Sequence, residues 1–417
     1  MVIQRDLYLQ KLIDRKQNGS IKVITGIRRC GKSYLLFKLY YDYLVQSGVP
    51  ADHIIKIALD DEEHEELLQS KALGSYVRSL IVDDGEYYIF LDEVQFVQGF
   101  EKVLNGLNRN EQLDIYVTGS NSKFLSSDIL TEFRGRGDEV RVYPLSFTEY
   151  VSAYEGSIDD AWRDYFTYGG LPLILSRKTD EQKANYLSNL FRKVYIDDII
   201  ERNNLRDDNV MESLVSILAS SVGSLTNPLK LANTFASKGM GKVTDKTISS
   251  YINYLLDAFL IAKVERYDVK GKKYIASPFK YYFTDLGLRN ARLNFRQQEE
   301  NHIMENIIYN ELLTRGFNVD VGVVERMEKD ETNKRVLKRY EIDFVCNQGS
   351  QRYYIQSAFA MPDAEKMEQE QRSLKYTDDF FKKIIIVKDN IKPWHNESGI
   401  LIVGIKDFLL HKNSLEM

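Results

Sequence analysis

Cysteine is scarce in this sequence of 417 residues: only Cys30 and Cys346 are present, far apart in the chain. Such a pair predicts neither a disulfide framework nor the closely spaced thiols of a zinc site. Long apolar runs are also missing, since none approaches the roughly 20 residues that cross a bilayer. The charged stretch 1–16 lacks the apolar core of a signal peptide. We therefore expect no disulfide, no membrane span and a location in the cytoplasm.

Proline and glycine are too few, at seven and 24 residues, to supply long disordered linkers. The length predicts about two to four compact domains, since domains run at roughly 100–200 residues. The net charge of −5 argues against a chain that binds nucleic acid over its whole surface. The stretch 227–290 differs, because it carries eleven Lys or Arg against five Asp or Glu. A local basic surface is expected there.

Apolar runs typical of strands alternate with helical periodicity over the first third of the chain. Strands are expected at 21–25, 54–59, 87–91 and 113–118, and a helix at 32–44. This alternation predicts a parallel sheet with helices on both faces. A first α/β domain is therefore expected over residues 1–146.

The segment 26–33, GIRRCGKS, matches the phosphate-binding pattern GxxxxGK[ST] in full, after an expected strand and at the start of an expected helix. Glycines let main-chain N–H groups surround a phosphate, Lys32 reaches the β- and γ-phosphates, and Ser33 offers a hydroxyl to Mg²⁺. The fold class is therefore an α/β P-loop NTPase, and ATP with Mg²⁺ is the predicted ligand. The predicted binding residues are Gly26, Ile27, Arg28, Arg29, Cys30, Gly31, Lys32, Ser33 and Tyr34.

A second acidic motif follows the expected strand 87–91. Asp92 is predicted to hold the Mg²⁺, and Glu93 to orient and polarise the attacking water. The Asp-Glu pair favours hydrolysis over small-molecule kinase chemistry.

Three further residues are candidates for the catalytic site. Ser120 and Asn121 follow the strand 113–118, where a polar side chain can sense the γ-phosphate; the alternative is a plain turn. Arg136 is a candidate for contacting the γ-phosphate, either within one chain or across a subunit interface. Its alternative is a surface ion pair.

The middle of the chain is helical by its periodicity. We expect a helical linker or lid over 147–206 and a winged-helix domain over 207–293, in which the helix 244–260 precedes strands at 262–267 and 273–275. Duplex DNA is a candidate partner for its basic face, which includes Lys246, Lys270, Lys272 and Lys273, with Lys242 beside them. A winged helix that serves only for packing is the alternative.

Motifs along most of the chain resemble those of prokaryotic AAA-type ATPases fused to a C-terminal domain of unknown function. The motifs are GIRRCGKS, YYIFLDE, YVTGSNS, RGRGDEVRVYPLSF and YGGLP, followed by YIDDII. The resemblance implies a P-loop fold with an additional strand, a winged-helix lid and a C-terminal fold like that of PD-(D/E)XK nucleases. It implies little about the biological role.

A third α/β domain is expected over 294–417, with a helix at 297–315, strands at 318–324, 339–346 and 352–356, a helix at 364–374 and a strand at 383–387. Its candidate site consists of Glu305, Asp343 and Gln356. Active nucleases of this type converge carboxylates on Mg²⁺ and place a lysine two residues after the last. Here Gln356 and Ala358 stand at those two positions, so we expect a degenerate nuclease-like domain that serves binding or assembly.

These features predict an ATPase that acts as a molecular switch on DNA or on a protein partner. They are compatible with an oligomer but do not specify the number of subunits. Two alternatives stay open. One is an ATP-regulated, metal-dependent nuclease, and the other is a slow signalling scaffold that needs no nucleic acid.

Overall fold

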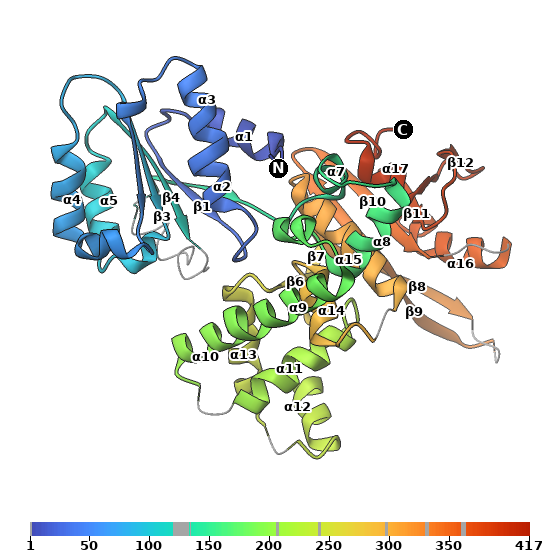
Figure 1. Ribbon diagram of the computed structural model, residues 1–417. Coiled ribbons are helices and arrows are strands. Elements are labelled where there is room, and N and C mark those ends of the chain that lie inside the picture. Colours follow the sequence, from blue (N-terminus) through green and yellow to red (C-terminus); the bar gives the residue numbers. More distant parts are fainter. Residues whose placement is uncertain are drawn as a thin grey trace. The chain divides into compact units, whose positions relative to one another are not determined.

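The computed structural model describes residues 2–119, 133, 135–205, 208–240, 243–296, 299–329, 333–359 and 364–417. The chain divides into two compact units (Figure 1). Unit 1 comprises Met1–Leu145, Leu171–Leu175 and Asp257–Phe259, and unit 2 comprises Ser146–Gly170, Ser176–Leu256 and Leu260–Met417. The first predicted boundary, at residue 146, therefore lies where the main part of unit 1 ends.

Unit 1 contains a parallel five-stranded sheet in the order β2-β3-β4-β1-β5. The order places β4 between the strand that leads into the P-loop (β1) and the strand that ends at Asp92 (β3), which agrees with the additional strand that the family resemblance implies. The strands are β1 (Ile21–Thr25), β2 (Ile54–Ala58), β3 (Tyr87–Asp92), β4 (Leu113–Gly119) and β5 (Gly137–Arg141).

Helices cover both faces of this sheet, and its central strands β3 and β4 are therefore buried along their whole length. On one face, α4 (Ser70–Ser79) and α5 (Phe100–Leu107) add Leu73, Val77 and Val103 to a core shared with Ile89 and Val117. The opposite face carries α2 (Lys32–Tyr34), a π-helical turn (35–40) and α3 (Tyr41–Gln46). Burial on both faces explains why the strands read as continuous apolar runs.

Unit 2 begins with helices, as predicted. Ser146 and Glu149 form a reciprocal capping box at the start of α7 (Phe147–Ser152). The helices that follow are α8 (Ile158–Tyr168), α9 (Asp180–Leu190), α10 (Asp197–Asn203), α11 (Asp208–Ser220), α12 (Pro228–Ser237), α13 (Asp245–Asp257) and α14 (Leu286–Arg292).

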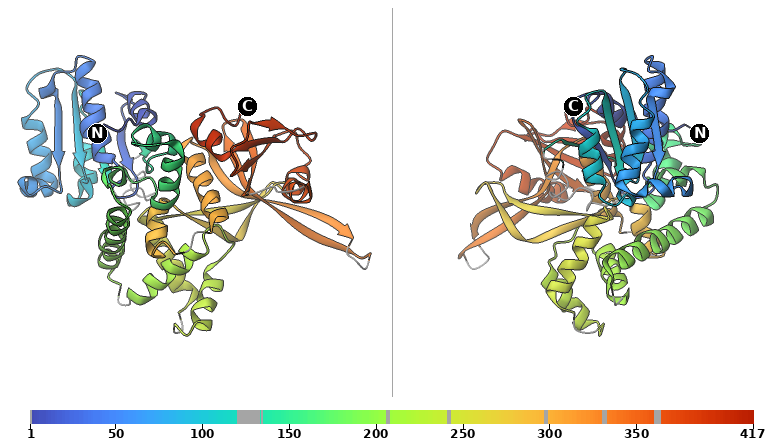
Figure 2. Two further views of the ribbon diagram at one scale, coloured as in Figure 1. Left: turned by 45° about the vertical axis from the view of Figure 1, so that its right-hand side comes forward. Right: turned by 90° about the vertical axis from the view of Figure 1, so that its left-hand side faces the viewer.

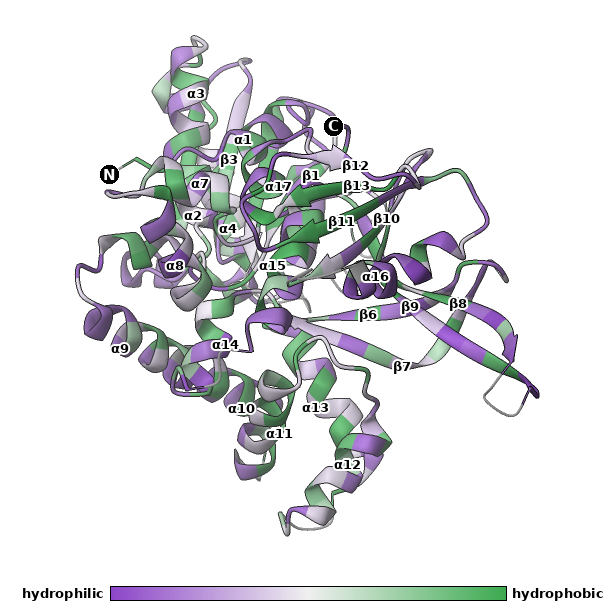
Figure 3. Cartoon of the chain, turned by 90° about the vertical axis from the view of Figure 1, so that its right-hand side faces the viewer, coloured by the Kyte–Doolittle hydropathy of each residue, from purple (hydrophilic) through white to green (hydrophobic). Residues whose placement is uncertain are grey.

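An eight-stranded mixed sheet forms the other half of unit 2, in the order β12-β13-β11-β10-β9-β8-β6-β7. Figure 2 shows its long β8–β9 hairpin, and Figure 3 shows that β11 and β13 are hydrophobic whereas the hairpin end is hydrophilic. The strands are β6 (Ile261–Asp268), β7 (Lys273–Phe283), β8 (Asn318–Lys329), β9 (Arg335–Gln348), β10 (Gln351–Ala358), β11 (Lys382–Val387), β12 (Trp394–His395) and β13 (Leu401–Gly404).

This sheet corrects the predicted boundary between a winged-helix domain and a C-terminal domain at 293/294. Strand β6 pairs with β7 on one side and, through Arg266–Asp268, with Val321–Val323 of β8 on the other. The β6–β7 hairpin, which we expected to belong to a separate winged-helix domain, is therefore an edge of the C-terminal sheet, and the residues after 259 lie in one structural unit.

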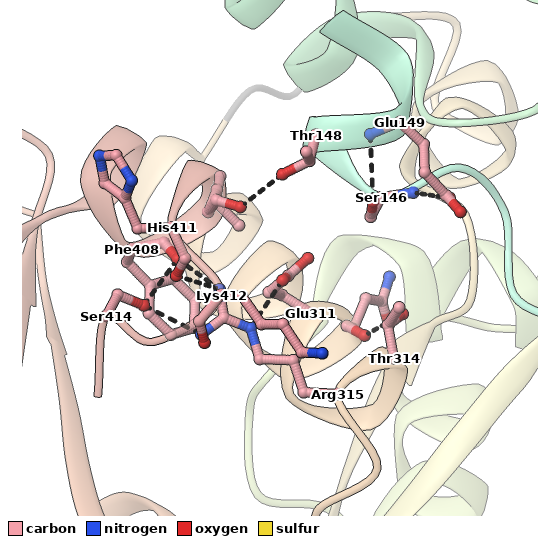
Figure 4. Close-up of polar contacts among 12 residues, drawn as sticks. Ser146, Thr148, Glu149, Glu311, Thr314, Arg315, Phe408, His411, Lys412 and Ser414 are labelled. Carbon is pink, nitrogen blue, oxygen red and sulfur yellow. Dashed lines mark hydrogen bonds and ion pairs between the residues drawn. The ribbon is translucent and has the colours of Figure 1, made fainter. Parts of the chain in front are cut away.

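The remaining helices are α15 (Glu300–Thr314), α16 (Ala364–Lys375) and α17 (Ile405–Leu410). Polar contacts tie α17 and the C-terminal end to the first helix of unit 2 and to α15 (Figure 4). The Thr148 hydroxyl donates to the Leu409 carbonyl at 2.8 Å, and Arg315 donates to Glu311 at 2.7 Å and to Ser414 at 2.9 Å. Within the described ranges, no helix is long and apolar enough to cross a membrane.

Candidate nucleotide-binding site

The loop 26–31 connects β1 to α2 and depends on glycine at both of its ends. Gly26 has φ 141°, and a Cβ atom there would lie 2.1 Å from the Val142 carbonyl oxygen. Gly31 has φ 100° and is the residue that precedes α2. Side chains are strained at both positions, so the predicted phosphate loop has the conformation that its glycines specify.

Lys32 is the first residue of α2, and its side chain packs against this loop, so that only 4% of its surface is exposed. Its ammonium donates to the Gly26 carbonyl at 3.0 Å and to the Ile27 carbonyl at 3.2 Å. A buried cation, loop amides and the start of a helix therefore lie together, which is an arrangement suited to a polyphosphate.

Ser33 and Asp92 meet although 59 positions separate them (92 − 33). The Ser33 hydroxyl hydrogen-bonds to the Asp92 carboxylate, and burial raises the pKa of Asp92 above its ordinary value. A hydroxyl beside a carboxylate at the edge of the phosphate loop is a ligand set that suits Mg²⁺. The site thus fits the predicted metal by the chemistry of its oxygen atoms.

Glu93 follows Asp92 and adopts a left-handed backbone conformation with φ 51°. Its backbone N–H donates to the Thr118 hydroxyl at 2.9 Å, and its carboxylate accepts a hydrogen bond from the Gln95 side chain. This backbone conformation is uncommon in residues other than glycine and is found at functional sites.

Thr118 is a site residue that the sequence reasoning missed. It is fully buried near the end of β4, its hydroxyl donates to Asp92, and it also accepts the bond from Glu93. The predicted candidates for this position, Ser120 and Asn121, lie outside the described residues. The available signal was a hydroxyl near the end of the strand between the two motif strands.

Arg136 lies at the opposite end of the strands from the P-loop, beside the first residue of β1. Its carbonyl accepts from Ile21, the first residue of β1, at 2.7 Å, whereas the P-loop begins after the last residue of β1. Five strand residues span about 16 Å. The structure therefore does not bring Arg136 to the P-loop of its own chain, which argues against the first of its alternatives, action in cis. Its action across a subunit interface stays a prediction.

Arg5 is a second residue that was missed, because nothing in the sequence links the first few residues to the P-loop. Its guanidinium donates to the Cys30 carbonyl at 2.9 Å and to the Tyr143 carbonyl at 2.7 Å, and it lies over the Tyr8 ring at 4.5 Å. Only 3% of Arg5 is exposed. It therefore ties the phosphate loop to the segment that follows β5.

Replacing Arg5 with methionine is expected to weaken ATP binding about tenfold, because charged hydrogen bonds of this kind contribute about 1.5–3 kcal/mol. The measurement is a titration with a fluorescent ATP analogue. Arg15→Met is the matched control, since Arg15 pairs with Asp138 at 2.9 Å near the other edge of the sheet. Equal affinities for the two variants would contradict the assignment of Arg5 as a positioning residue.

In unit 2, the structure brings together the three residues predicted for the degenerate site. Glu305 lies on α15, Asp343 on β9 and Gln356 on β10, and the Asp343 N–H points at the Gln356 side-chain oxygen at 3.4 Å. A fourth residue, Lys280 of β7, was missed. Its ammonium lies 2.7 Å from Glu305 and 3.6 Å from Asp343.

The described lysines that were predicted to face DNA lie at two places in unit 2. Lys246 is exposed in the first turn of α13. At the β6–β7 turn, Lys272 and Lys273, the first residue of β7, are exposed, and Lys270 forms an ion pair with Asp378. Lys242 lies outside the described residues.

Comparison with known proteins finds a family of AAA domains over residues 18–151 and a domain of unknown function (DUF8612) over 159–299. An uncharacterized protein of Haemophilus influenzae is 33% identical over 416 residues, which are 98% of this chain and 99% of the relative. An uncharacterized protein of Methanocaldococcus jannaschii is 28% identical over 431 residues, with coverage of 97% and 88%.

Among solved structures, the Aeropyrum pernix ORC1 protein in complex with DNA is similar over 70% of this chain and 92% of that chain. Its sequence identity is 13% and its TM-score 0.29. A TM-score this low carries no argument about function. The family match to the AAA domain and the parallel sheet in unit 1 support ATPase character in general.

Proposed function

This chain belongs to the same protein family as its Haemophilus influenzae relative and has an AAA-type P-loop domain, and we propose that it is an ATP-binding and ATP-hydrolysing molecular switch. One observation carries the proposal. Ser33, Asp92 and Thr118 form a hydrogen-bonded group beside the buried ammonium of Lys32, at the end of the sheet where the P-loop begins. Release of phosphate from ATP by the purified protein in Mg²⁺ tests it.

Each residue of this group has a role in the proposed reaction. The loop amides and Lys32 hold the β- and γ-phosphates, and Ser33 and Asp92 hold Mg²⁺, which neutralises charge on the phosphates when bound. Glu93 orients the attacking water and accepts its proton. Thr118 fixes the Asp92 carboxylate and the backbone of Glu93, so that both acids keep their positions.

Arg136 is proposed to act on the nucleotide of a neighbouring copy. The proposal rests on the exposure of the Arg136 side chain and on its position at the end of the strands opposite its own P-loop. An arginine supplied from another subunit can stabilise the charge of the transferred phosphoryl group.

The switch requires a path from the nucleotide to the rest of the chain. Tyr143, which accepts one of the two Arg5 hydrogen bonds, lies three residues before Ser146, where unit 2 begins (146 − 143). Arg5 therefore gives the phosphate loop a direct contact with the last residues of unit 1 before Ser146. We assign to this contact the transmission of the nucleotide state.

Duplex DNA is the partner that we propose for unit 2. Three helices (α11, α12 and α13) precede the β6–β7 hairpin, and Thr226 pairs with Phe279 of β7, an arrangement that supports the winged-helix interpretation. The exposed ends of α13 and of the hairpin carry Lys246, Lys272 and Lys273. Cations on one module can neutralise phosphates without reading base sequence.

Replacing Lys270, Lys272 and Lys273 together with glutamate is expected to weaken binding to a duplex of about 30 base pairs at least about tenfold, because each lysine that neutralises a phosphate adds to the affinity. Electrophoretic mobility shifts at several salt concentrations measure this. Lys71 and Lys102, exposed lysines of unit 1, give the matched control when both are changed to glutamate. Failure of the wild-type protein to bind at any salt concentration, together with a co-purified protein partner, would instead favour the scaffold.

A further inference from the structure

The ammonium of Lys280 lies among three carboxylates of unit 2. It is 2.7 Å from Glu305, 2.8 Å from Glu341 and 3.6 Å from Asp343. Lys280 is 3% exposed, and Glu305 and Asp343 are each 8% exposed. One positive charge of the chain itself therefore lies where the candidate acidic residues converge.

Glu305 and Asp343 already accept hydrogen bonds from other groups of the protein. Glu305 accepts through the same oxygen from Lys280 and from the Tyr282 hydroxyl, and its other oxygen faces His302 at 3.8 Å. Asp343 accepts from the Ser357 N–H at 2.8 Å. A divalent cation would have to replace these donors or share the carboxylates with them.

The charges of Lys280 and of the three carboxylates around it agree with an ammonium standing where a metal ion would otherwise lie. Burial opposes the charge on Lys280, but Tyr282 and the surrounding carboxylates raise its pKa well above the ordinary value, so it stays protonated. A divalent ion a few ångströms from this ammonium would meet strong repulsion in a buried site. In the part of the chain that the structure describes, no group of three or more His, Cys, Asp or Glu side chains is arranged to hold a metal ion.

We propose that the Lys280 ammonium occupies the cation position of this acidic site, so that unit 2 keeps the site without a metal ion. The ammonium joins β7, α15 and β9 into one assembly, and it holds the β6–β7 hairpin to the C-terminal sheet. A neutral side chain at position 280 leaves the three carboxylates without their cation, so that side-chain rearrangement lets them bind a divalent cation with a preference for oxygen ligands, such as Mn²⁺.

This proposal is independent of ATP binding, because the acidic site and the P-loop share no residue. It also separates two explanations for the missing carboxylate at Gln356. If Lys280 serves an active metal site, the wild-type protein binds a metal ion beside it. If Lys280 replaces the metal, the wild-type protein does not, and removal of the ammonium restores binding.

The experiment is a titration of nucleotide-free protein with Mn²⁺, followed by electron paramagnetic resonance of the free ion. Lys280→Met is expected to bind one Mn²⁺ at least about tenfold more tightly than the wild type, whereas Lys280→Arg, which keeps the positive charge, is expected to behave like the wild type. The double variant Lys280→Met, Asp343→Asn should lose the gained site. Circular dichroism shows whether each variant is folded.

Two results would overturn the proposal. One is a wild-type protein that binds one Mn²⁺ and loses it on Asp343→Asn. The other is a folded Lys280→Met protein that gains no Mn²⁺ site. Where Lys280→Met does not fold, Lys280→Gln replaces it in the same comparison, because its amide still donates a hydrogen bond to the carboxylates.

Discussion

Replacing Lys32 with alanine is expected to weaken ATP binding at least about 100-fold, which corresponds to about 2.7 kcal/mol. The structure gives two reasons. The variant lacks the ammonium that would contact the phosphates. It also lacks the two hydrogen bonds that Lys32 donates to the Gly26 and Ile27 carbonyls of the loop. Fluorescence anisotropy of a labelled ATP analogue measures the change in Kd.

The control for this variant lies on the same helical segment. Lys38 is exposed and pairs with Asp42 at 2.9 Å, so Lys38→Ala should leave nucleotide affinity and folding unchanged. An affinity of Lys32→Ala within a factor of about two of the wild type would show that the ammonium does not contact the nucleotide.

Replacing Glu93 with glutamine is expected to leave ATP binding intact and to lower kcat about 10²- to 10³-fold, because the amide cannot accept the proton of the attacking water. The change keeps the shape of the side chain, and the bond from the Glu93 N–H to Thr118 belongs to the backbone and persists. Phosphate release at saturating ATP gives kcat, and the anisotropy titration gives the affinity.

Glu101→Gln, in the first turn of α5, is the matched control for this variant. It removes one negative charge from the same unit and should leave kcat unchanged. Hydrolysis by Glu93→Gln at the parental rate would mean that another group positions the water.

The sequence alone predicted four strands of the parallel sheet, but not β5, and it supplied most of the residues that we propose for the phosphate site, since both follow from local patterns. The strand 87–92 is buried on both faces and reads as a continuous apolar run, and the phosphate loop is defined by glycines that its backbone angles require. Asp92 and Ser33 could be paired from the sequence because the carboxyl ends of parallel strands lie at the same end of the sheet, where the loop after β1 also lies.

Two of the residues that were missed, Arg5 and Lys280, depend on contacts that no local pattern records. Arg5 reaches Cys30 and Tyr143 from the N-terminal segment. Lys280 meets Asp343 because β7 belongs to the same sheet as β9, although 63 positions separate them (343 − 280). The pairing of β6 with β8 is likewise a choice of strand neighbours, which periodicity does not specify.

Arg136 shows the same limit for a motif that was recognised. Arg136 follows the expected strand 113–118, so its sequence position suggested that it lies near the phosphates. Because β4 and β5 are both parallel to β1, however, β5 begins at the end of the sheet opposite the P-loop. The end of the sheet at which such an arginine lies depends on where the next parallel strand starts. The register of β5 with β1 shows where that strand starts.

Whether this protein holds a nucleotide at its P-loop is measured by isothermal titration calorimetry of the wild type with ATP and with ADP, each in the presence of Mg²⁺. We expect saturable binding of one nucleotide per chain, with affinity reduced when Mg²⁺ is removed by a chelator, because Ser33 and Asp92 then have no metal ion to share with the phosphates. A folded protein that takes up neither nucleotide under these conditions would show that the P-loop is not a nucleotide site.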